Sequence, residues 1–141
     1  SCARRVSELR RPVLRALLTH RDRTLRVRTQ IGEAEAQWVI VARIKHYAGD
    51  LILVPQADLR QESLYVLRIV GSGPLHRIRQ LSAFALGLLR CDPGVCVEAA
   101  NRVRIDGDPA TPVQIDGEVL GELPLEIGLH PERLKLIFPF E

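Results

Sequence analysis

Two carboxylates stand one residue apart near the end of the chain, in the segment Ile115-Asp116-Gly117-Glu118. Carboxylates can accept protons and bind cations, so this segment holds side chains suited to chemistry. An apolar run precedes it, and Asp-Gly between apolar strands predicts a tight hairpin turn, because glycine tolerates positive φ. The near-repeat Ile105-Asp106-Gly107-Asp108 has the same features. On the residues alone, both copies are predicted to be turns.

The cysteines and histidines do not show the spacing of a metal site. Cys91 and Cys96 are separated by Asp-Pro-Gly-Val, which is not a zinc-knuckle spacing, and Cys2 and the histidines are scattered. An odd cysteine count without a secretory signal predicts reduced thiols in a cytosolic protein. Gly71-Ser72-Gly73 precedes a predicted helix, but it lacks the glycine spacing and the lysine of a nucleotide phosphate loop.

The composition predicts a soluble globular protein with a single domain over residues 1–141, since 46% of the residues are hydrophobic and 26% are charged. No apolar run approaches the roughly 18 residues of a membrane-spanning helix. The basic N-terminus is not followed by the apolar region of a signal peptide. We therefore expect a cytoplasmic protein. The chain starts at Ser1 without a methionine, so we expect it to be a fragment of a longer protein.

The N-terminal part of the chain is rich in arginine. Residues 4–28 contain nine arginines, and their only acidic residues are Glu8 and Asp22. Such a patch could meet an anionic membrane, nucleic acid or an acidic partner, and a solvated face is the plain alternative. Aromatic residues make up 4% of the chain, which disfavours a stacking platform for single-stranded nucleic acid. We do not expect nucleic acid to be a partner.

Hydrophobic periodicity predicts a mainly β domain. Apolar residues at helical spacing predict helices over residues 6–18 and 74–90. Strict alternation predicts a strand over residues 25–31, and the apolar run at 38–42 predicts a central strand. Further strands are predicted at 50–54, 64–70, 95–105, 111–115, 119–129 and 133–138. Many strands with short connections predict an antiparallel β-sandwich with two peripheral helices, α+β by content.

Several segments, in order, resemble the C-terminal domain of the diacylglycerol kinase, sphingosine kinase and bacterial lipid kinase family. Residues 112–118 resemble the family's "pvqvDGE" strand and turn, and residues 133–139 resemble its closing strand, which ends in proline. Residues 39–49 resemble "vivgN…yGGg", and residues 53–58 resemble "laPdAd". The resemblance implies a C-terminal β-sandwich domain whose N-terminal nucleotide-binding domain is absent from this chain.

The resemblance also implies roles for particular residues. In the family, the aspartate of the "DGE" turn acts as general base toward the lipid hydroxyl, which implies Asp116 as the base and Glu118 as a residue that supports the metal or orients Asp116. The family's "DG.ld" loop, where an aspartate can hold a structural magnesium, reads Gln61-Glu62-Ser63-Leu64-Tyr65 here. Asp58 and Glu62 keep carboxylates in that loop and are the candidate metal ligands.

The cofactors and partners follow from the same resemblance. It implies Mg²⁺ and ATP for the full-length enzyme, with neither bound tightly by this chain alone. It implies the protein's own N-terminal nucleotide-binding domain as a partner, a lipid substrate at a membrane surface, and a homo-oligomer. The alternative is a non-catalytic β-sandwich module that binds a protein partner or an anionic membrane surface, in which both Asp-Gly pairs are turns only.

Overall fold

The described chain consists of short strands and one α-helix. The computed structural model describes residues 23–47, 51–116, 118–119 and 121–131. The helix predicted over 6–18 and the strand predicted over 133–138 lie outside these residues. The elements are β1 (Leu25–Thr29), β2 (Glu33–Ala36), β3 (Trp38–Ala42), β4 (His46–Tyr47), β5 (Leu51–Ile52), β6 (Leu64–Ile69), α2 (Pro74–Ala85), the 3₁₀-helix η1 (Leu89–Cys91), β7 (Val95–Ala100), β8 (Arg102–Asp106), β9 (Gln114–Ile115), β10 (Glu118–Val119) and β11 (Leu125–Gly128).

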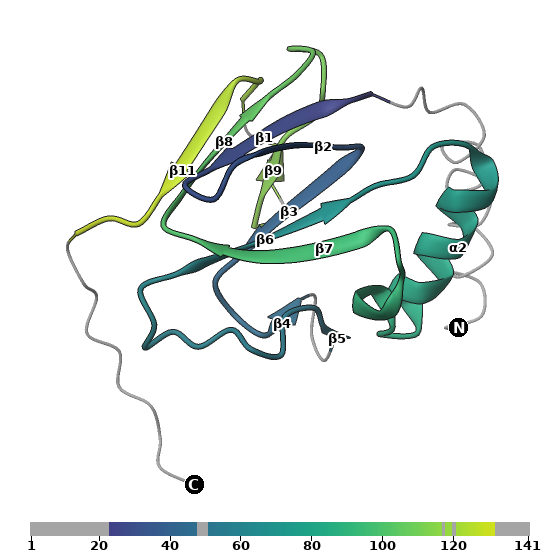
Figure 1. Ribbon diagram of the computed structural model, residues 1–141, viewed down its shortest axis with the longest axis horizontal. Coiled ribbons are helices and arrows are strands. Elements are labelled where there is room, and N and C mark those ends of the chain that lie inside the picture. The colour runs from purple at the N-terminus through teal and green to yellow at the C-terminus, as the bar shows by residue number, and fades with distance from the viewer. Residues whose placement is uncertain (1–22, 48–50, 117, 120, 132–141) are drawn as a thin grey trace, which may run out of the picture.

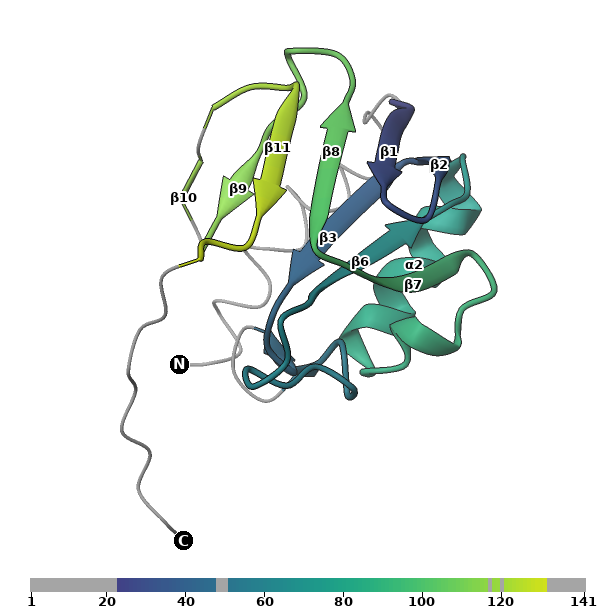
Figure 2. The ribbon, with the colours of Figure 1, turned by 60° about the vertical axis from the view of Figure 1, so that its left-hand side comes forward.

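Two sheets carry most of the strands (Figure 1). The four-stranded sheet has the order β11-β8-β1-β2, and the three-stranded sheet has the order β3-β6-β7. All of these pairs are antiparallel, as are the small pairs β4–β5 and β9–β10. The predicted antiparallel β-sandwich is confirmed, with α2 at its margin (Figure 2).

The three-stranded sheet is covered on both faces. One face packs with the four-stranded sheet around a first core, and the other packs with α2, η1 and the segment after β5 around a second core. The buried residues of the first core are Leu25, Val27, Ala36, Val66, Ala100, Val103, Ile105 and Leu123, and those of the second are Leu53, Val54, Ala57, Tyr65, Leu67, Ile69 and Leu89. Since successive residues of a strand face opposite sides, a strand covered on both sides has a continuous apolar sequence.

Residues 38–42 were predicted to form a central strand, and among the described residues β3 lies at the edge of the order β3-β6-β7. Among the described strands, β3 pairs only with β6. Its apolar sequence has another cause: Val39 and Val41 pack on the first core, while Ile40 and Ala42 pack on the second. Packing against a core on each face of the strand therefore accounts for the apolar run.

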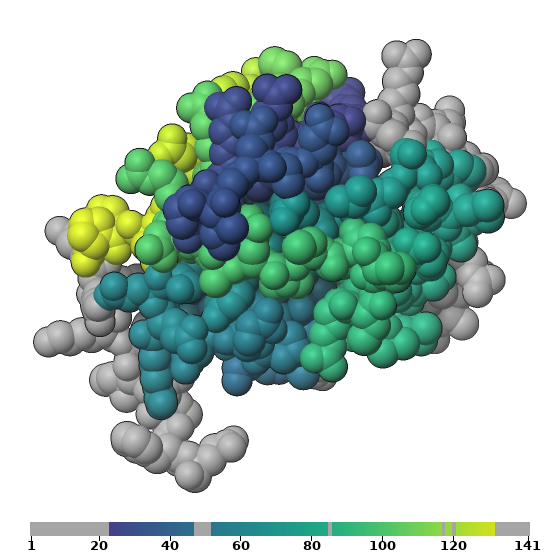
Figure 3. All heavy atoms as spheres, viewed as in Figure 1, coloured from purple at the N-terminus to yellow at the C-terminus, as the bar shows by residue number. Residues whose placement is uncertain are grey.

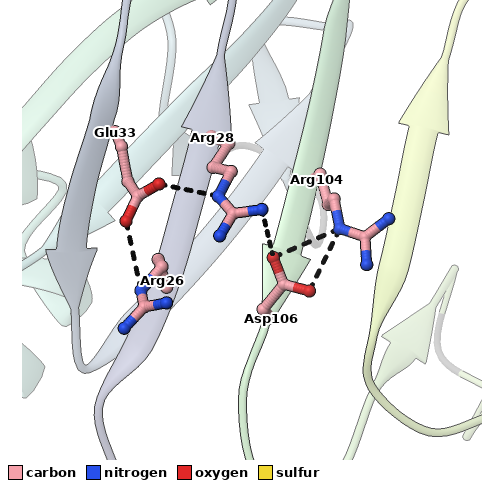
Figure 4. A network of polar contacts seen from close by, with 5 residues as sticks. All are labelled: Arg26, Arg28, Glu33, Arg104 and Asp106. Atoms are coloured by element: carbon pink, nitrogen blue, oxygen red, sulfur yellow. Dashed lines mark hydrogen bonds and ion pairs between the residues drawn. The ribbon is translucent and has the colours of Figure 1, made fainter.

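The outer face of the four-stranded sheet carries a network of alternating charges (Figure 4). Arg28 Nε donates to Glu33 Oε2 at 2.7 Å, and Arg26 Nε lies 3.2 Å from Glu33 Oε1. Arg28 Nη1 lies 3.8 Å from Asp106, and Arg104 Nε donates to Asp106 Oδ1 at 3.0 Å. Water and salt screen exposed pairs of this kind, so they contribute little to stability. Their effect is to fix the direction of these side chains on the surface.

The helix α2 is shorter than the predicted span because a glycine ends it. Gly87 has a φ of 68°, Leu88 N–H donates to Ala83 O at 2.7 Å, and Gly87 N–H donates to Phe84 O at 3.0 Å. These two bonds form a Schellman motif, which favours glycine at the left-handed position. The predicted helix at 74–90 is therefore α2 followed by η1. Within the described residues, no helix has the length and apolar composition that crossing a membrane requires.

The face of α2 that packs on the domain combines buried polar residues with the apolar side chain of Phe84. Arg77 and Gln80 are buried, and Gln80 Nε2 donates to Val70 O at 2.9 Å. Leu75, at the start of the helix, is 80% exposed. The helix forms the surface at one end of the molecule, where its side chains are teal in Figure 3. Hydrogen bonds and ion pairs thus attach α2 to the sandwich alongside the apolar contact of Phe84.

A buried carboxylate, Asp92, ties α2 to the loop before β7. Arg79 Nε and Nη2 donate to its two oxygens at 2.7 and 2.9 Å, and Gly94 N–H donates to it at 2.8 Å. Burial disfavours the charged form and by itself would raise the pKa of Asp92. The hydrogen bonds from Arg79 and Gly94 and the charges of Arg79 and His76 outweigh burial, so the pKa of Asp92 is lowered.

We expect Asp92→Asn to lower the free energy of unfolding by about 1–3 kcal/mol near neutral pH, because it removes the charge that satisfies two donors of Arg79. A folded-state pKa below the unfolded value of about 3.9 stabilises the fold above that pH, and this stabilisation is lost as pH falls through the folded-state pKa. In urea unfolding, the difference in the free energy of unfolding between wild type and Asp92→Asn should therefore become smaller below about pH 4. If this difference stayed constant as the pH is lowered, the charge of Asp92 would not be what stabilises the fold.

Candidate active-site hairpin

The segment around Asp116 forms a tight β-hairpin. In the pair β9–β10, Ile115 lies opposite Glu118 and Gln114 lies opposite Val119, so Asp116 and Gly117 form the connection. Asp116 has a φ of 49°, in the left-handed region that Asp and Asn tolerate better than other residues with a side chain. Positive φ at the first residue of a two-residue connection is typical of the type I′ and type II′ turns that join hairpin strands. The turn predicted at Asp116 is confirmed.

The hairpin exposes both of its carboxylates and its apolar residues. Asp116 and Glu118 are exposed, Ile115 is 43% exposed and Val119 is 80% exposed. In Figure 2, β9 and β10 lie beside β11 at the margin of the molecule that faces away from α2. A substrate or a second domain could therefore reach Asp116 without any rearrangement of the sandwich.

The near-repeat at Asp106 has a different structure, and its prediction as a tight turn is wrong. Asp106 is the last residue of β8 and lies opposite Arg26 in β1. The chain turns later, where Thr111 N–H donates to Asp108 O at 2.8 Å and Ala110 N–H donates to Asp108 Oδ1 at 2.9 Å. Proline follows Asp108, as is common in such turns.

Gly107 lies close to two side chains of the first core. A Cβ at this position would lie 2.8 Å from Leu25 Cδ2 and 2.9 Å from Leu123 Cδ1. Both leucines belong to the first core. Of the two aspartates in the near-repeat, only Asp116 lies in the connection of a β-hairpin.

The candidate metal ligands Asp58 and Glu62 lie on the loop between β5 and β6, away from the hairpin in the chain. Asp58 Oδ1 accepts the N–H of Arg60 at 3.0 Å, and Glu62 is exposed. Across the part of the chain that the structure describes, no group of three or more His, Cys, Asp or Glu residues could hold a metal ion. Magnesium requires near-octahedral oxygen ligands. These two carboxylates do not form such a cage by themselves, and their metal role stays a prediction.

Sequence reasoning missed the polar groups that strands bring together. Arg68 in β6 lies 3.1 Å from Glu98 and donates to Cys96 Sγ at 3.4 Å, both of them in β7. Tyr65, in the same strand, is buried, and its hydroxyl lies within hydrogen-bonding distance of Gln56 and Gln61. A charged residue and a hydroxyl inside an otherwise apolar run were the available signals, but their partners are distant in the sequence.

Comparison with known proteins supports one family and one fold. The family described as "YegS C-terminal NAD kinase beta sandwich-like domain" matches residues 5–138. Among solved structures, a presumed diacylglycerol kinase from Bacillus anthracis str. Sterne has a TM-score of 0.56 at 14% identity, over 82% of this chain and 41% of that one. A second structure of that description and organism has a TM-score of 0.55 at 16% identity, over 82% and 42%. The chain thus spans about two fifths of these proteins. A search of curated proteins found no significant match.

Proposed function

Because this chain belongs to the family of YegS C-terminal NAD kinase beta sandwich-like domains, we propose that it is the substrate-side domain of an ATP-dependent lipid kinase of the diacylglycerol kinase type. The observation that carries the proposal is the exposed hairpin with Asp116 in its connection. A carboxylate fixed at the tip of a short hairpin is suited to accept a proton from a group on a second body.

In the proposed reaction, the carboxylate of Asp116 takes the proton of a lipid hydroxyl. The freed oxygen forms a bond to the γ-phosphorus of ATP, and the bond from that phosphorus to the bridging oxygen of ADP breaks. Glu118 follows on the next strand and is also exposed, so it can orient Asp116 or a cation. Magnesium bound with the nucleotide would neutralise charge on the phosphates. The residues of this chain hold the proton acceptor in place.

The nucleotide would be bound by a second domain of the same protein. Ile115 and Val119 flank the two carboxylates and are exposed in this chain, so they offer apolar surface for such a domain to cover. The chains with a similar fold are more than twice as long as the region that this chain matches. The rest of such a chain is long enough to form a nucleotide-binding domain. The lipid would be reached at the surface of a membrane, with the protein at its cytoplasmic side.

The chain by itself is expected neither to bind magnesium-ATP with micromolar affinity nor to phosphorylate a lipid. Its sequence contains no glycine-rich phosphate loop, and a shared fold does not supply one. Isothermal titration calorimetry of the chain with magnesium-ATP tests the first part, and transfer of labelled phosphate to diacylglycerol tests the second. Micromolar binding to this chain would refute the assignment of the nucleotide to another domain.

A non-catalytic interaction module is the second candidate function, and the exposed side of α2 favours it. Leu75, Leu86 and Leu88 are exposed on and after this helix. In Figure 2, α2 lies on the opposite side of the sandwich from β9 and β10. A partner bound at α2 would therefore leave Asp116 uncovered. A folded full-length protein that transfers no phosphate to any lipid would favour this function.

A further inference from the structure

The loop between β5 and β6 is held to the sandwich by a buried tyrosine. Tyr65 lies in the middle strand of the three-stranded sheet and belongs to the second core. Its hydroxyl lies 3.1 Å from Gln56 O and 2.9 Å from the side-chain oxygen of Gln61. A phenol has one proton, so it donates to one of these at a time. With the Gln61 amide turned over, its NH₂ donates to the phenol oxygen while the phenol donates to Gln56 O, and both contacts are satisfied.

Apolar burial and backbone hydrogen bonds hold the rest of this loop in place. Leu53, Val54 and Ala57 are buried in the second core, and Ala57 N–H donates to Val54 O at 3.0 Å. Further along, Gln61 N–H donates to Asp58 O at 3.0 Å, and Asp58 Oδ1 caps the N–H of Arg60. The loop thus has apolar anchors at its start, a hydrogen-bonded turn at Asp58, and the Tyr65 hydroxyl between its two halves.

This arrangement differs from the predicted magnesium loop at the same place. One oxygen of the predicted ligand Asp58 already accepts a hydrogen bond from the N–H of Arg60 within the turn. The other predicted ligand, Glu62, is exposed. We propose that Tyr65 and Gln61 do by direct hydrogen bonding what a divalent cation would do in this loop. Residues 55–63 then fold onto the sandwich without magnesium. The proposal concerns the architecture of the domain and holds whether or not the protein is a kinase.

Limited proteolysis of the full chain gives a local test, because Arg60 is an exposed trypsin site within this loop. Cleavage after Arg60 in the wild type should proceed at the same rate in excess MgCl₂ and in excess EDTA. Tyr65→Phe and Gln61→Ala should each speed this cleavage by about tenfold, the factor expected for losing a hydrogen bond worth about 1.4 kcal/mol. Thermal unfolding should show a lower Tm for Tyr65→Phe by about 4–6 °C, again without a magnesium effect.

The matched control is Gln56→Ala. Gln56 contributes its main-chain carbonyl, so removing its exposed side chain should leave both the cleavage rate and the Tm unchanged. Slower cleavage or a higher Tm of the wild type in magnesium would overturn the proposal and support the metal site at Asp58 and Glu62. Cleavage of Gln61→Ala at the wild-type rate would overturn it as well. Neither result depends on kinase activity, so a failure here is distinct from a failure of the proposed function.

Discussion

Asp116→Asn is expected to lower kcat for lipid phosphorylation by about 10²-fold or more in the protein that joins this chain to a nucleotide-binding domain. Asparagine cannot take the proton of the lipid hydroxyl. It tolerates the left-handed φ of 49° at this position and fits a two-residue turn before glycine, so the hairpin should survive. The KM for ATP should change little, because the nucleotide would be bound by the other domain. Steady-state kinetics with purified protein and diacylglycerol measures both quantities.

Asp106→Asn is the matched control, since the same Ile-Asp-Gly sequence surrounds it. Asp106 lies at the end of β8 and accepts from Arg104 on the outer face of the sheet. Its replacement weakens an exposed network, so kcat should stay near the wild-type value. Equal and small effects at both aspartates would reduce Asp116 to a turn residue and remove the main residue-level argument for catalysis.

Leu67→Ala is expected to lower the free energy of unfolding by about 2–5 kcal/mol. Leu67 lies in the middle strand of the three-stranded sheet, is fully buried, and points into the second core. Truncation removes its contacts and leaves a cavity that the neighbouring strands on both sides cannot easily close. Urea unfolding followed by circular dichroism measures the loss.

Leu75→Ala makes the same chemical change on α2, where the leucine is 80% exposed. Alanine is at least as good a helix former as leucine, so the free energy of unfolding should change by less than about 0.5 kcal/mol. A loss at Leu75 as large as that at Leu67 would mean that another part of the protein covers the outer face of α2.

The strands with a clear period could be predicted from the sequence. In β1, Leu25 and Val27 point into the first core while Arg26 and Arg28 point outward, and this alternation is visible in the sequence. The helix α2 was equally clear, although its end at Gly87 required a left-handed residue to be recognised. The similarity to the C-terminal domain of diacylglycerol kinase-like lipid kinases, first inferred from ordered short motifs, is confirmed by the family match over residues 5–138.

Other parts of the fold depend on contacts that a local pattern does not contain. The predicted strand at 95–105 is two strands that meet at Asn101 and belong to different sheets. The predicted strand at 119–129 covers the last residue of β10 and all of β11, and β11 joins the four-stranded sheet. Such breaks arise because the chain passes from one layer of the sandwich to another. The turn predicted at Asp106 was wrong because β8 stays paired with β1 as far as Asp106, and a local Asp-Gly signal does not contain that pairing.

In the candidate site, too, local features could be predicted from the sequence and contacts between distant residues could not. The hairpin at Asp116 follows from an Asp-Gly pair between apolar residues, which is a local signal. The contact of Tyr65 with Gln56 and Gln61 could not be read from the sequence, because it depends on how the loop returns to β6. The roles of Asp116 and Glu118 in catalysis, and of Asp58 and Glu62 in metal binding, stay predictions.

The central claim is that this domain supplies the lipid-side half of a phosphoryl-transfer site. The most direct measurement is the rate at which labelled γ-phosphate passes from ATP to diacylglycerol, in the protein that joins both domains and in its nucleotide-binding domain alone. We expect transfer by the joined protein, and none above background by the nucleotide-binding domain or by this chain alone. Transfer at the same rate by the nucleotide-binding domain without this chain would contradict the account.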